Sequence, residues 1–498
     1  MLKECWQNIL QDIDVRQNLS KIREIIRETK DVNLVLMIIK DEEDKLINLL
    51  ESEDAKTRKN AALLMGDLKE EGFLTPIWQA YEKESMRFIK SSYLSAIGKF
   101  DYGVYVDKMK EQLLLLQETK MTEESQKHIT EEMRELSALI LRLSGVKKRK
   151  FTGWDESYQI VLLTNRNFTE NVREELLDLI PDAVTKNVGA GVMANVPNLR
   201  WVRELRTYQE LLFIIPGIAP CKMEVEEIAN KIIQSKLFSF LEKSHEGKAP
   251  YYFRLEMKSK RDLGEKSIFL KKLSSRIELL SNRNLINTKE NYEIELRLIE
   301  NKQGNCNIMV KLFTLRDNRF TYRKDFLPTS IKPVNAALVV SLSQKYMKED
   351  AQVLDPFCGV GTMLIERHKA VRANTTYGID ILEEAIVKAR DNTDIAKQVI
   401  HYINKDFFTF SHDYLFDEII TNMPFSMGRF TESDVYDIYE KFFLYAPKLL
   451  KKGALVILYT HNRGLVRQMI EKASFRLLEE YEVSRKNGCY VMTLRYTE

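Results

Sequence analysis

The sequence predicts a multidomain protein with an α-helical repeat region, an α+β platform and a C-terminal α/β domain. Three observations predict it. A chain of 498 residues is too long for a single hydrophobic core. Residues 1–145 carry apolar side chains at helical spacing, whereas residues after Ser330 alternate short apolar strands with helices. The residues between these regions mix short strands with helices, in a pattern that fits neither.

Composition narrows the class of protein further. Lysine and arginine number 76 against 73 acidic residues, so any contact with nucleic acid must come from a local patch. The five cysteines form no CxxC pair, which argues against disulfides and against a metal site. No segment has the apolar core of a signal peptide or the length of a membrane span. We expect a soluble, cytoplasmic protein with no metal and no membrane contact.

Residues 1–148 are expected to form helices throughout. The stretches 59–66 and 90–98 are alike and lie about 32 residues apart, a period typical of helical solenoids. Their small residues would let helices approach, and Gly66 and Gly98 would each close a helix. The pattern resembles HEAT-like repeats, with an unrelated bundle as the alternative, and a protein partner is expected here. The basic run of residues 147–150 would mark the boundary, as a solvated linker or as a phosphate contact.

The platform is predicted to contain both kinds of element. We expect strands at 159–163, 183–196 with a glycine break, 211–215, 292–299, 306–313 and 320–325. We expect helices at 169–179, capped by Thr169, and at 199–205, 224–238 and 267–280.

The C-terminal domain is predicted to hold seven strands, most of them parallel because helices fill most of the gaps. The strands are expected at 352–354, 376–379, 400–404, 418–421, 454–459, 476–482 and 489–496. No helix separates the last two, so they should form an antiparallel hairpin at the edge of the sheet. This arrangement predicts a doubly wound, Rossmann-like fold.

The loop after the first of these strands reads Asp-Pro-Phe-Cys-Gly-Val-Gly-Thr at 355–362. Gly359 and Gly361 would let the backbone approach a ligand closely. Leu364 stands where a dinucleotide site needs a third glycine, and no Gly-Lys-Ser/Thr completes a phosphate-binding loop. Asp355 would repel a phosphate but could accept hydrogen bonds from an amino group. An amino-acid-like, zwitterionic ligand is therefore favoured.

The next two strands also end in carboxylates. Asp380 could accept both hydroxyls of a ribose, and Asp406 could accept from the amino group of an adenine. The simpler interpretation of each aspartate alone is an ordinary turn residue. Three acidic strand ends in succession favour a nucleoside ligand.

The fourth strand leads into Asn422, Met423, Pro424 and Phe425. An aryl amine is a poor nucleophile because its lone pair is delocalised into the ring. The Asn422 oxygen and a backbone carbonyl near Met423 could accept hydrogen bonds from the two N–H groups of such an amine. Phe425 could stack on a base that is turned out of its helix. Positioning and electrostatics would then provide the catalysis without a strong general base. An ordinary turn is the alternative.

Together, the motifs at 355–362 and 422–425 resemble those of THUMP-domain class I methyltransferases, which form N2-methylguanosine in RNA. Residues 329–338 resemble the helix that leads into that family's catalytic domain. Residues 272–280 with the strands to 325 look like the THUMP module, and 151–225 look like its ferredoxin-like companion. The resemblance implies four domains: helical repeats at 1–148, ferredoxin-like at 151–225, THUMP at 226–328 and a methyltransferase at 329–498.

The resemblance also implies roles for individual residues. S-adenosyl-L-methionine would be bound by Asp355, Phe357, Gly359, Gly361, Thr362, Asp380, Asp406 and Phe407. The target base would be held by Asn422, Met423, Pro424 and Phe425. RNA phosphates would be contacted by Lys271, Arg276, Arg323 and Arg429, for which surface solubility is the alternative. Many relatives have aspartate at 422 and proline at 423, and the helical region is not part of their usual layout.

The expected function is methyl transfer to the exocyclic N2 of a guanosine, in the acceptor stem of a tRNA. The alternatives are a guanosine in 23S ribosomal RNA, an adenine in DNA, and a scaffold that binds cofactor and RNA without catalysis. The sequence does not indicate the target nucleotide, the number of methyl groups or the oligomeric state.

Overall fold

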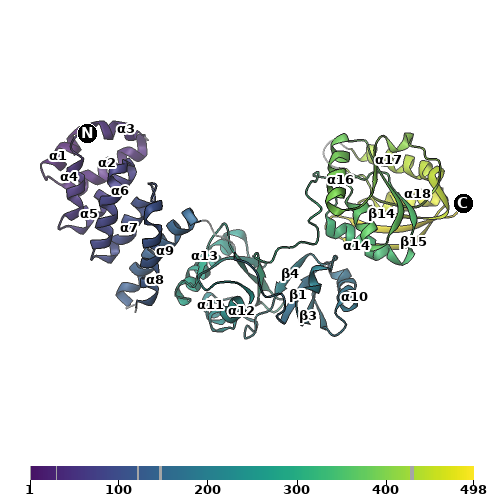
Figure 1. Cartoon of the computed structure of the whole chain (residues 1–498), viewed down its shortest axis with the longest axis horizontal. Helices are drawn as coiled ribbons and strands as arrows, with labels where there is room; N and C mark the ends of the chain where they lie inside the picture. Colours follow the sequence, from purple (N-terminus) through teal and green to yellow (C-terminus); the bar gives the residue numbers. More distant parts are fainter. Residues whose placement is uncertain (1, 30, 120–122, 145–148, 427–430) are drawn as a thin grey trace. The chain divides into compact units, whose positions relative to one another are not determined.

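The computed structural model describes residues 2–29, 31–119, 123–144, 149–426 and 431–498. The chain forms two compact units. One comprises Met1–Lys148, Ala249–Arg254 and Ile268–Tyr292, and the other Arg149–Lys248, Leu255–Ser267 and Glu293–Glu498. Figure 1 labels most of the helices and strands of the chain. Within the described ranges, no helix is both long enough and apolar enough to cross a membrane.

The N-terminal region is helical, as predicted. Its helices are α1 (Leu2–Leu10), α2 (Val15–Thr29), α3 (Val32–Ile39), α4 (Glu43–Asn48), α5 (Ala55–Leu68), α6 (Leu74–Lys83), α7 (Arg87–Ile97), α8 (Val106–Glu118) and α9 (Glu123–Ser144). They share one apolar core that includes Trp6, Ile22, Trp78 and Leu136. Such a core results from the helical spacing of apolar residues, which gives each helix one buried face. The assignment to HEAT-like repeats remains a prediction.

The two glycines of the repeated stretches have different roles. Gly98 caps the C-terminus of α7, as expected. Gly66 lies inside α5, so the expectation that it closes a helix is wrong. A Cβ atom at Gly66 would lie 2.8 Å from the Cα of Ala96 in α7. The absence of a side chain therefore allows α5 and α7 to pack backbone against backbone.

Replacing Gly66 by valine should lower the free energy of unfolding of the helical region by about 1–3 kcal/mol, because the added methyl groups overpack this contact. Gly72→Val is the matched control, since a Cβ at Gly72 meets nothing within 4 Å. Urea unfolding followed by circular dichroism measures both variants. Equal urea midpoints for the two variants would show that the close approach of α5 and α7 does not contribute to stability.

The α+β part begins with an antiparallel sheet. β1 (Tyr158–Leu163) pairs with β3 (Gly191–Val196) and β4 (Glu210–Phe213), and β3 also pairs with β2 (Val184–Val188). β9 (Asn305–Leu312) pairs with β4, β5 (Cys221–Lys222) and β8 (Ile294–Glu300). The helices here are α10 (Thr169–Leu179), α11 (Val225–Gln234), α12 (Leu237–Ser244) and α13 (Leu263–Leu280). A parallel pair that was not predicted joins β6 (Tyr251–Lys258) to β7 (Leu285–Asn287).

Several predictions for the α+β part are wrong. The helix expected at 199–205 is only a short 3-10 turn, Trp201–Arg203. The helix expected at 224–238 is interrupted, because the backbone of Ser235 is extended and ends α11; the Ser235 hydroxyl accepts from the Leu237 amide at the start of α12. Thr169 is already inside α10 and does not cap it.

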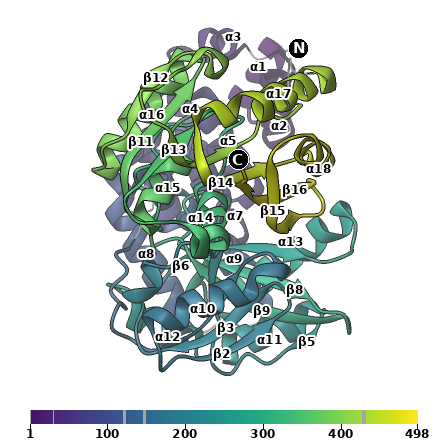
Figure 2. The same ribbon diagram turned by 90° about the vertical axis from the view of Figure 1, so that its right-hand side faces the viewer.

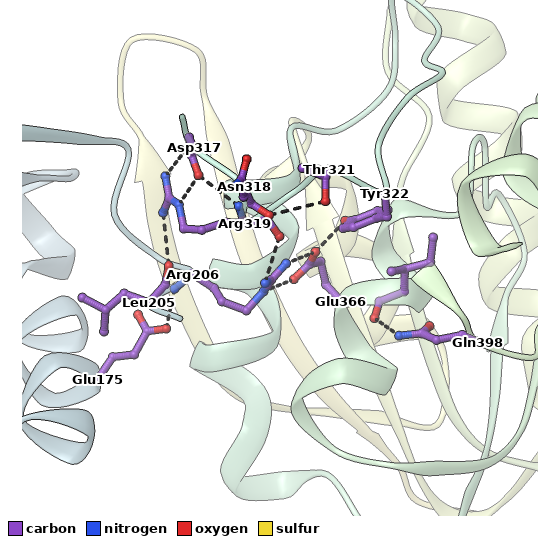
Figure 3. Close-up of polar contacts among 11 residues, drawn as sticks. Glu175, Leu205, Arg206, Asp317, Asn318, Arg319, Thr321, Tyr322, Glu366 and Gln398 are labelled. Carbon is purple, nitrogen blue, oxygen red and sulfur yellow. Dashed lines mark hydrogen bonds and ion pairs between the residues drawn. The ribbon is translucent and has the colours of Figure 1, made fainter. Parts of the chain in front are cut away.

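The strand expected at 320–325 is also absent, and a buried polar network explains why (Figure 3). Arg206 donates from Nε and Nη2 to the Glu366 carboxylate, at 2.7 Å each. The Tyr322 hydroxyl donates to the same carboxylate at 2.5 Å, and Arg206 Nη1 donates to the Arg319 carbonyl at 3.1 Å. The alternating aromatic residues here therefore pack around this network and not in a sheet, since the Arg206 guanidinium lies 4.6 Å from the Phe320 ring centroid.

The C-terminal sheet matches the prediction in strand number and direction. Its strands are β10 (Ala351–Asp355), β11 (Ala373–Asp380), β12 (His401–Asn404), β13 (Phe416–Asn422), β14 (Leu450–Thr460), β15 (Phe475–Ser484) and β16 (Cys489–Tyr496). Their order is β12-β11-β10-β13-β14-β16-β15. Most of these strands are labelled in Figure 2. All pairs up to β14 are parallel. The terminal hairpin is antiparallel, and β16 lies between β14 and β15.

Helices cover both faces of this sheet, as a doubly wound fold requires. α14 (Pro333–Ser343), α15 (Thr362–Ala370) and α16 (Glu383–Ala396) contribute to the core on one face. α17 (Glu432–Tyr445) and α18 (Arg463–Lys472) contribute to the core on the other. The parallel strands are therefore buried on both faces, and their carboxyl ends meet at one edge.

Candidate functional site

A cavity of about 450 Å³ opens at the carboxyl ends of β10, β11, β12 and β13. Almost every predicted cofactor-binding and base-binding residue lines it: Asp355, Phe357, Gly359, Thr362, Asp380, Asp406, Phe407, Asn422, Met423, Pro424 and Phe425. Gly361 is the exception. The topology therefore brings two motifs that are about 60 residues apart in the sequence to one cavity, as expected for an open α/β sheet.

The two glycines of the loop have different surroundings. Gly359 has a φ of +53°, and a Cβ there would meet nothing within 4 Å, so the backbone borders open space. Gly361 has a φ of +79°, and a Cβ there would lie 2.1 Å from the Tyr402 hydroxyl. Both positions thus favour glycine, Gly359 through its conformation and Gly361 also because Tyr402 occupies the space.

Asp355 is the most deeply buried charged group of the cavity, with 1% of its surface exposed. Its Oδ1 accepts from the Phe357 amide at 3.0 Å. Its Oδ2 has no hydrogen-bond partner of good geometry within the described part of the chain. Burial raises the pKa of this carboxyl to about 7, although Thr421 and the Phe357 amide oppose the rise. Oδ2 is thus an acceptor that a bound cation could use.

The other two aspartates hold the local backbone in place. Asp380 accepts from the Gly359 and Leu382 amides at 2.9 Å each, and burial raises its pKa. The first of these bonds connects the ends of β10 and β11. Asp406 accepts from the Phe408 amide at 2.9 Å and caps a short 3-10 helix. Each therefore has the ordinary turn function that the sequence allowed, at a position that also lines the cavity.

Aromatic rings form the wall beside the cavity. Phe357 contacts Phe407 and Phe408 edge to face, at centroid distances of 5.8 and 6.4 Å. Phe407 is buried and also contacts Phe442 of α17 at 6.1 Å. An apolar wall of this kind suits a planar ligand ring.

The segment 422–425 is held at its second residue. The Met423 amide donates to the Tyr459 carbonyl of β14 at 2.9 Å, and the Met423 side chain is fully buried. Asn422 ends β13 and is half-buried, and its side-chain amide finds no hydrogen-bond partner among the described residues. The side-chain amide of Asn422 is thus free to bond a ligand in the cavity, whereas the side chain of Met423 packs in the hydrophobic core.

Sequence reasoning missed several lining residues. Ile438 and Lys441 reach the cavity from α17, and Leu327 reaches it from the segment before α14. Nothing in the sequence marks the first two, because single residues on an amphipathic helix carry no motif. Residues 329–331, inside the segment singled out from the sequence, also line the cavity.

None of the described residues predicted to contact RNA lines the cavity. Lys271 is exposed and Arg276 half-buried on α13. Arg323 lies in the other unit, and its guanidinium is 5.8 Å from the Phe326 ring centroid. Burial lowers the pKa of Arg323. Arg429 lies outside the described residues, so these roles remain predictions.

In the basic run at 147–150, Lys147 and Lys148 lie outside the described residues. Arg149 donates to the Glu293 carboxylate at 2.9 Å and to the Lys248 carbonyl at 2.7 Å. The interpretation of Arg149 as part of a solvated linker is therefore wrong, because its side chain is bonded to Glu293 and Lys248.

The five cysteines are buried and free. Among the described residues, no cluster of three or more His, Cys, Asp or Glu could hold a metal ion.

Comparison with known families supports the prediction for the C-terminal domain. Residues 321–490, about a third of the chain, match the UPF0020 family, described as an RMKL-like methyltransferase domain. The C-terminal part of the chain is therefore a methyltransferase domain, and the prediction of S-adenosylmethionine as the methyl donor is confirmed.

Solved structures show that the likeness of fold extends further. TrmN from Thermus thermophilus is 19% identical, with a TM-score of 0.52 over 68% of this chain and 99% of that one. A predicted N6-adenine-specific DNA methylase from Listeria monocytogenes is 15% identical, with a TM-score of 0.52 over 68% and 96%. SMU.472, described as a methyltransferase and complexed with SAH, is 14% identical, with a TM-score of 0.54 over 69% and 99%. These matches cover about twice the length of the C-terminal domain.

Proposed function

We propose that this protein transfers a methyl group from S-adenosylmethionine to the exocyclic N2 of a guanosine in RNA, with tRNA as its substrate. One observation carries the proposal. The cavity places the unused Asn422 amide and the Phe425 ring beside the buried Asp355 carboxylate and the open backbone of Gly359. One cavity thus offers a place for a methyl donor and a place for a planar amine.

The residues present fit the cofactor. The partnerless Oδ2 of Asp355 would accept from the α-ammonium group, and the Gly359 backbone leaves room for the methionine chain. Asp380 and Asp406 would accept from the ribose hydroxyls and the adenine amino group. Phe357 and Phe407 would contact the adenine ring. When bound, the cofactor supplies a methyl group on a sulfonium, which is a good leaving group.

The chain's own residues would activate the acceptor. The Asn422 side-chain oxygen and the backbone carbonyl of Met423 or of a residue next to it would accept hydrogen bonds from the two N–H groups of the amine. These bonds would turn the nitrogen lone pair toward the methyl group. The bond between the Met423 amide and the Tyr459 carbonyl fixes this backbone before substrate arrives. Preorganised acceptors of this kind cost no reorganisation in the transition state.

The affinity for S-adenosylhomocysteine should depend on pH through Asp355. In the free protein this carboxyl has a pKa of about 7, so below pH 7 it must lose a proton before it can pair with an ammonium group. The affinity should therefore fall by up to about tenfold for each pH unit below 7. Isothermal titration calorimetry between pH 5.5 and 7 should show proton release on binding. Asp355→Asn should bind more weakly and with a flat pH dependence; the same slope in both proteins would assign it to another group.

The direct test of the function is transfer of labelled methyl groups from S-adenosylmethionine to total RNA that lacks the modification, followed by nucleoside analysis. We expect N2-methylguanosine in the tRNA fraction. Label confined to ribosomal RNA, or found in another nucleoside, would overturn the substrate and leave the catalytic residues standing. No label in any RNA or DNA would favour the non-catalytic scaffold.

A second substrate class is favoured by one specific observation. A structure of similar fold is described as an N6-adenine-specific DNA methylase, and the amine of adenine could use the same acceptor pair at 422–425. The assay therefore includes unmethylated duplex and single-stranded DNA. Label in N6-methyladenine would replace the guanosine proposal.

A further inference from the structure

The Phe425 ring, which lines the cavity, is stacked on an imidazole that the proposed function does not use. The ring centroids of Phe425 and His461 lie 4.3 Å apart, with an angle of 29° between the ring planes. His461 follows the end of β14, 36 residues further along the chain. His461 does not line the cavity, whereas Phe425 does. The imidazole therefore covers one face of the Phe425 ring, and the imidazole itself is not part of the cavity lining.

The His461 imidazole also contacts residues of β14 and of the β15–β16 hairpin. Its Nδ1 lies 3.1 Å from the Asn487 carbonyl, in the turn between β15 and β16. The Cys489 sulfur lies 3.4 Å from Nδ1 and 3.5 Å from Nε2. The ring of Tyr459 contacts the imidazole edge to face, at a centroid distance of 6.0 Å. The hairpin and β14 thus fix the position and tilt of the imidazole.

These contacts matter because of where Phe425 lies in the chain. Met423, two residues earlier, is anchored by its backbone hydrogen bond to Tyr459 and by its side chain, which lies in the core. An aromatic side chain in a loop rotates about its side-chain bonds unless something packs on its face. A base that stacks on a rotating ring would lose the orientation that brings its amino group to Asn422.

We propose that His461 is a positioning residue, which holds the Phe425 ring as a one-sided stacking surface for the target base. It acts through Phe425 and does not touch the base. The inference rests on the proposed function, in that a nucleobase must enter the cavity, and it adds a residue that determines how the base is oriented. Because the imidazole covers one ring face, a stacking base has only the other face available.

The kinetic test compares His461→Ala with His461→Phe, which restores a flat ring. For RNA that the wild type methylates, His461→Ala should lower kcat/KM by about 5- to 50-fold, the range expected when stacking of one base is weakened. The affinity for S-adenosylhomocysteine should not change, and His461→Phe should recover most of the loss. His401→Ala is the matched control, because His401 stands at the start of β12, at the opposite end of the parallel strands. Wild-type kinetics in His461→Ala would overturn the inference and leave the proposed function intact.

A second measurement needs no substrate. The ring of Phe425 should shift the proton signals of the His461 imidazole in the NMR spectrum of the free protein, and the chain has only six histidines to assign. Phe425→Leu should move the His461 signals and leave those of His401 in place. Unmoved His461 signals would overturn the inference even if every RNA assay succeeds. If the wild type methylates no nucleic acid, the proposed function fails and the base-orienting role fails with it.

Discussion

Replacing Asn422 by alanine is expected to lower the rate of methyl transfer by about 10²- to 10³-fold, the usual cost of removing one preorganised polar group from a transition state. Asn422 ends β13 at the cavity, and no described residue competes for its side-chain amide. Without the Asn422 side chain, the lone pair of the amine would stay delocalised into the ring. The substitution would therefore slow methyl transfer itself and not the binding of the cofactor.

The measurement is single-turnover transfer of labelled methyl groups, with the affinity for S-adenosylhomocysteine determined in parallel. The affinity should be unchanged, because the proposed cofactor contacts lie at or just after the ends of β10, β11 and β12. Asn422→Asp retains an acceptor and should keep substantial activity. Asn187→Ala, an exposed asparagine on β2, controls for the substitution itself. A rate for Asn422→Ala within a few-fold of the wild type would remove Asn422 from the chemistry.

The second large effect concerns stability. Arg206→Ala should lower the free energy of unfolding by about 3–5 kcal/mol, because it leaves the Glu366 carboxylate without its bidentate partner in a buried site. Glu366 is 1% exposed and lies on α15, one turn after the glycine loop (Figure 3). Among the residues that the structure describes, only the Tyr322 hydroxyl would remain as a donor to it.

Arg200→Ala is the matched control for this experiment. The Arg200 side chain makes a similar two-bond contact with Asp155, at 2.6 and 2.8 Å, but both side chains are exposed. Exposed pairs contribute little, so this variant should unfold like the wild type. Thermal unfolding by calorimetry measures both variants. Arg206→Met combined with Glu366→Leu should recover part of the loss, since no buried charge is then left alone. Equal unfolding temperatures for Arg206→Ala and Arg200→Ala would contradict the prediction.

The sequence predicted the C-terminal domain well because its signals are local. The strands β10 and β13 are short apolar runs, and Asp355, Asp380 and Asn422 stand at the strand ends, where parallel strands place ligands. The same reasoning failed at 320–325, where alternating residues suggested a strand. Phe320 and Tyr322 instead pack on Arg206 and Glu366, partners more than 40 residues away that no local pattern reveals.

The stack of Phe425 on His461 was missed for a similar reason. The two rings come together because β13 pairs with β14, and each ring lies just beyond the end of its strand. Gly361 gives the opposite lesson. The sequence motif around Gly361 was recognised, and Gly361 was expected to lie against the cofactor. In the structure, the Tyr402 hydroxyl fills the space beside it.

The position of β16 has a consequence for biosynthesis. A ribosome completes β14 and β15 before β16 exists, yet in the finished sheet β16 separates them. Until β16 is made, one edge of the apolar strand β14 has no partner, and an open edge of this kind invites pairing with other chains. Cys489 and the turn that holds His461 also arrive only with β16. A nascent chain would thus have the proposed cofactor loop complete while the side chains proposed to orient the base are still unsupported. A chaperone that shields strand edges would be most useful at that stage.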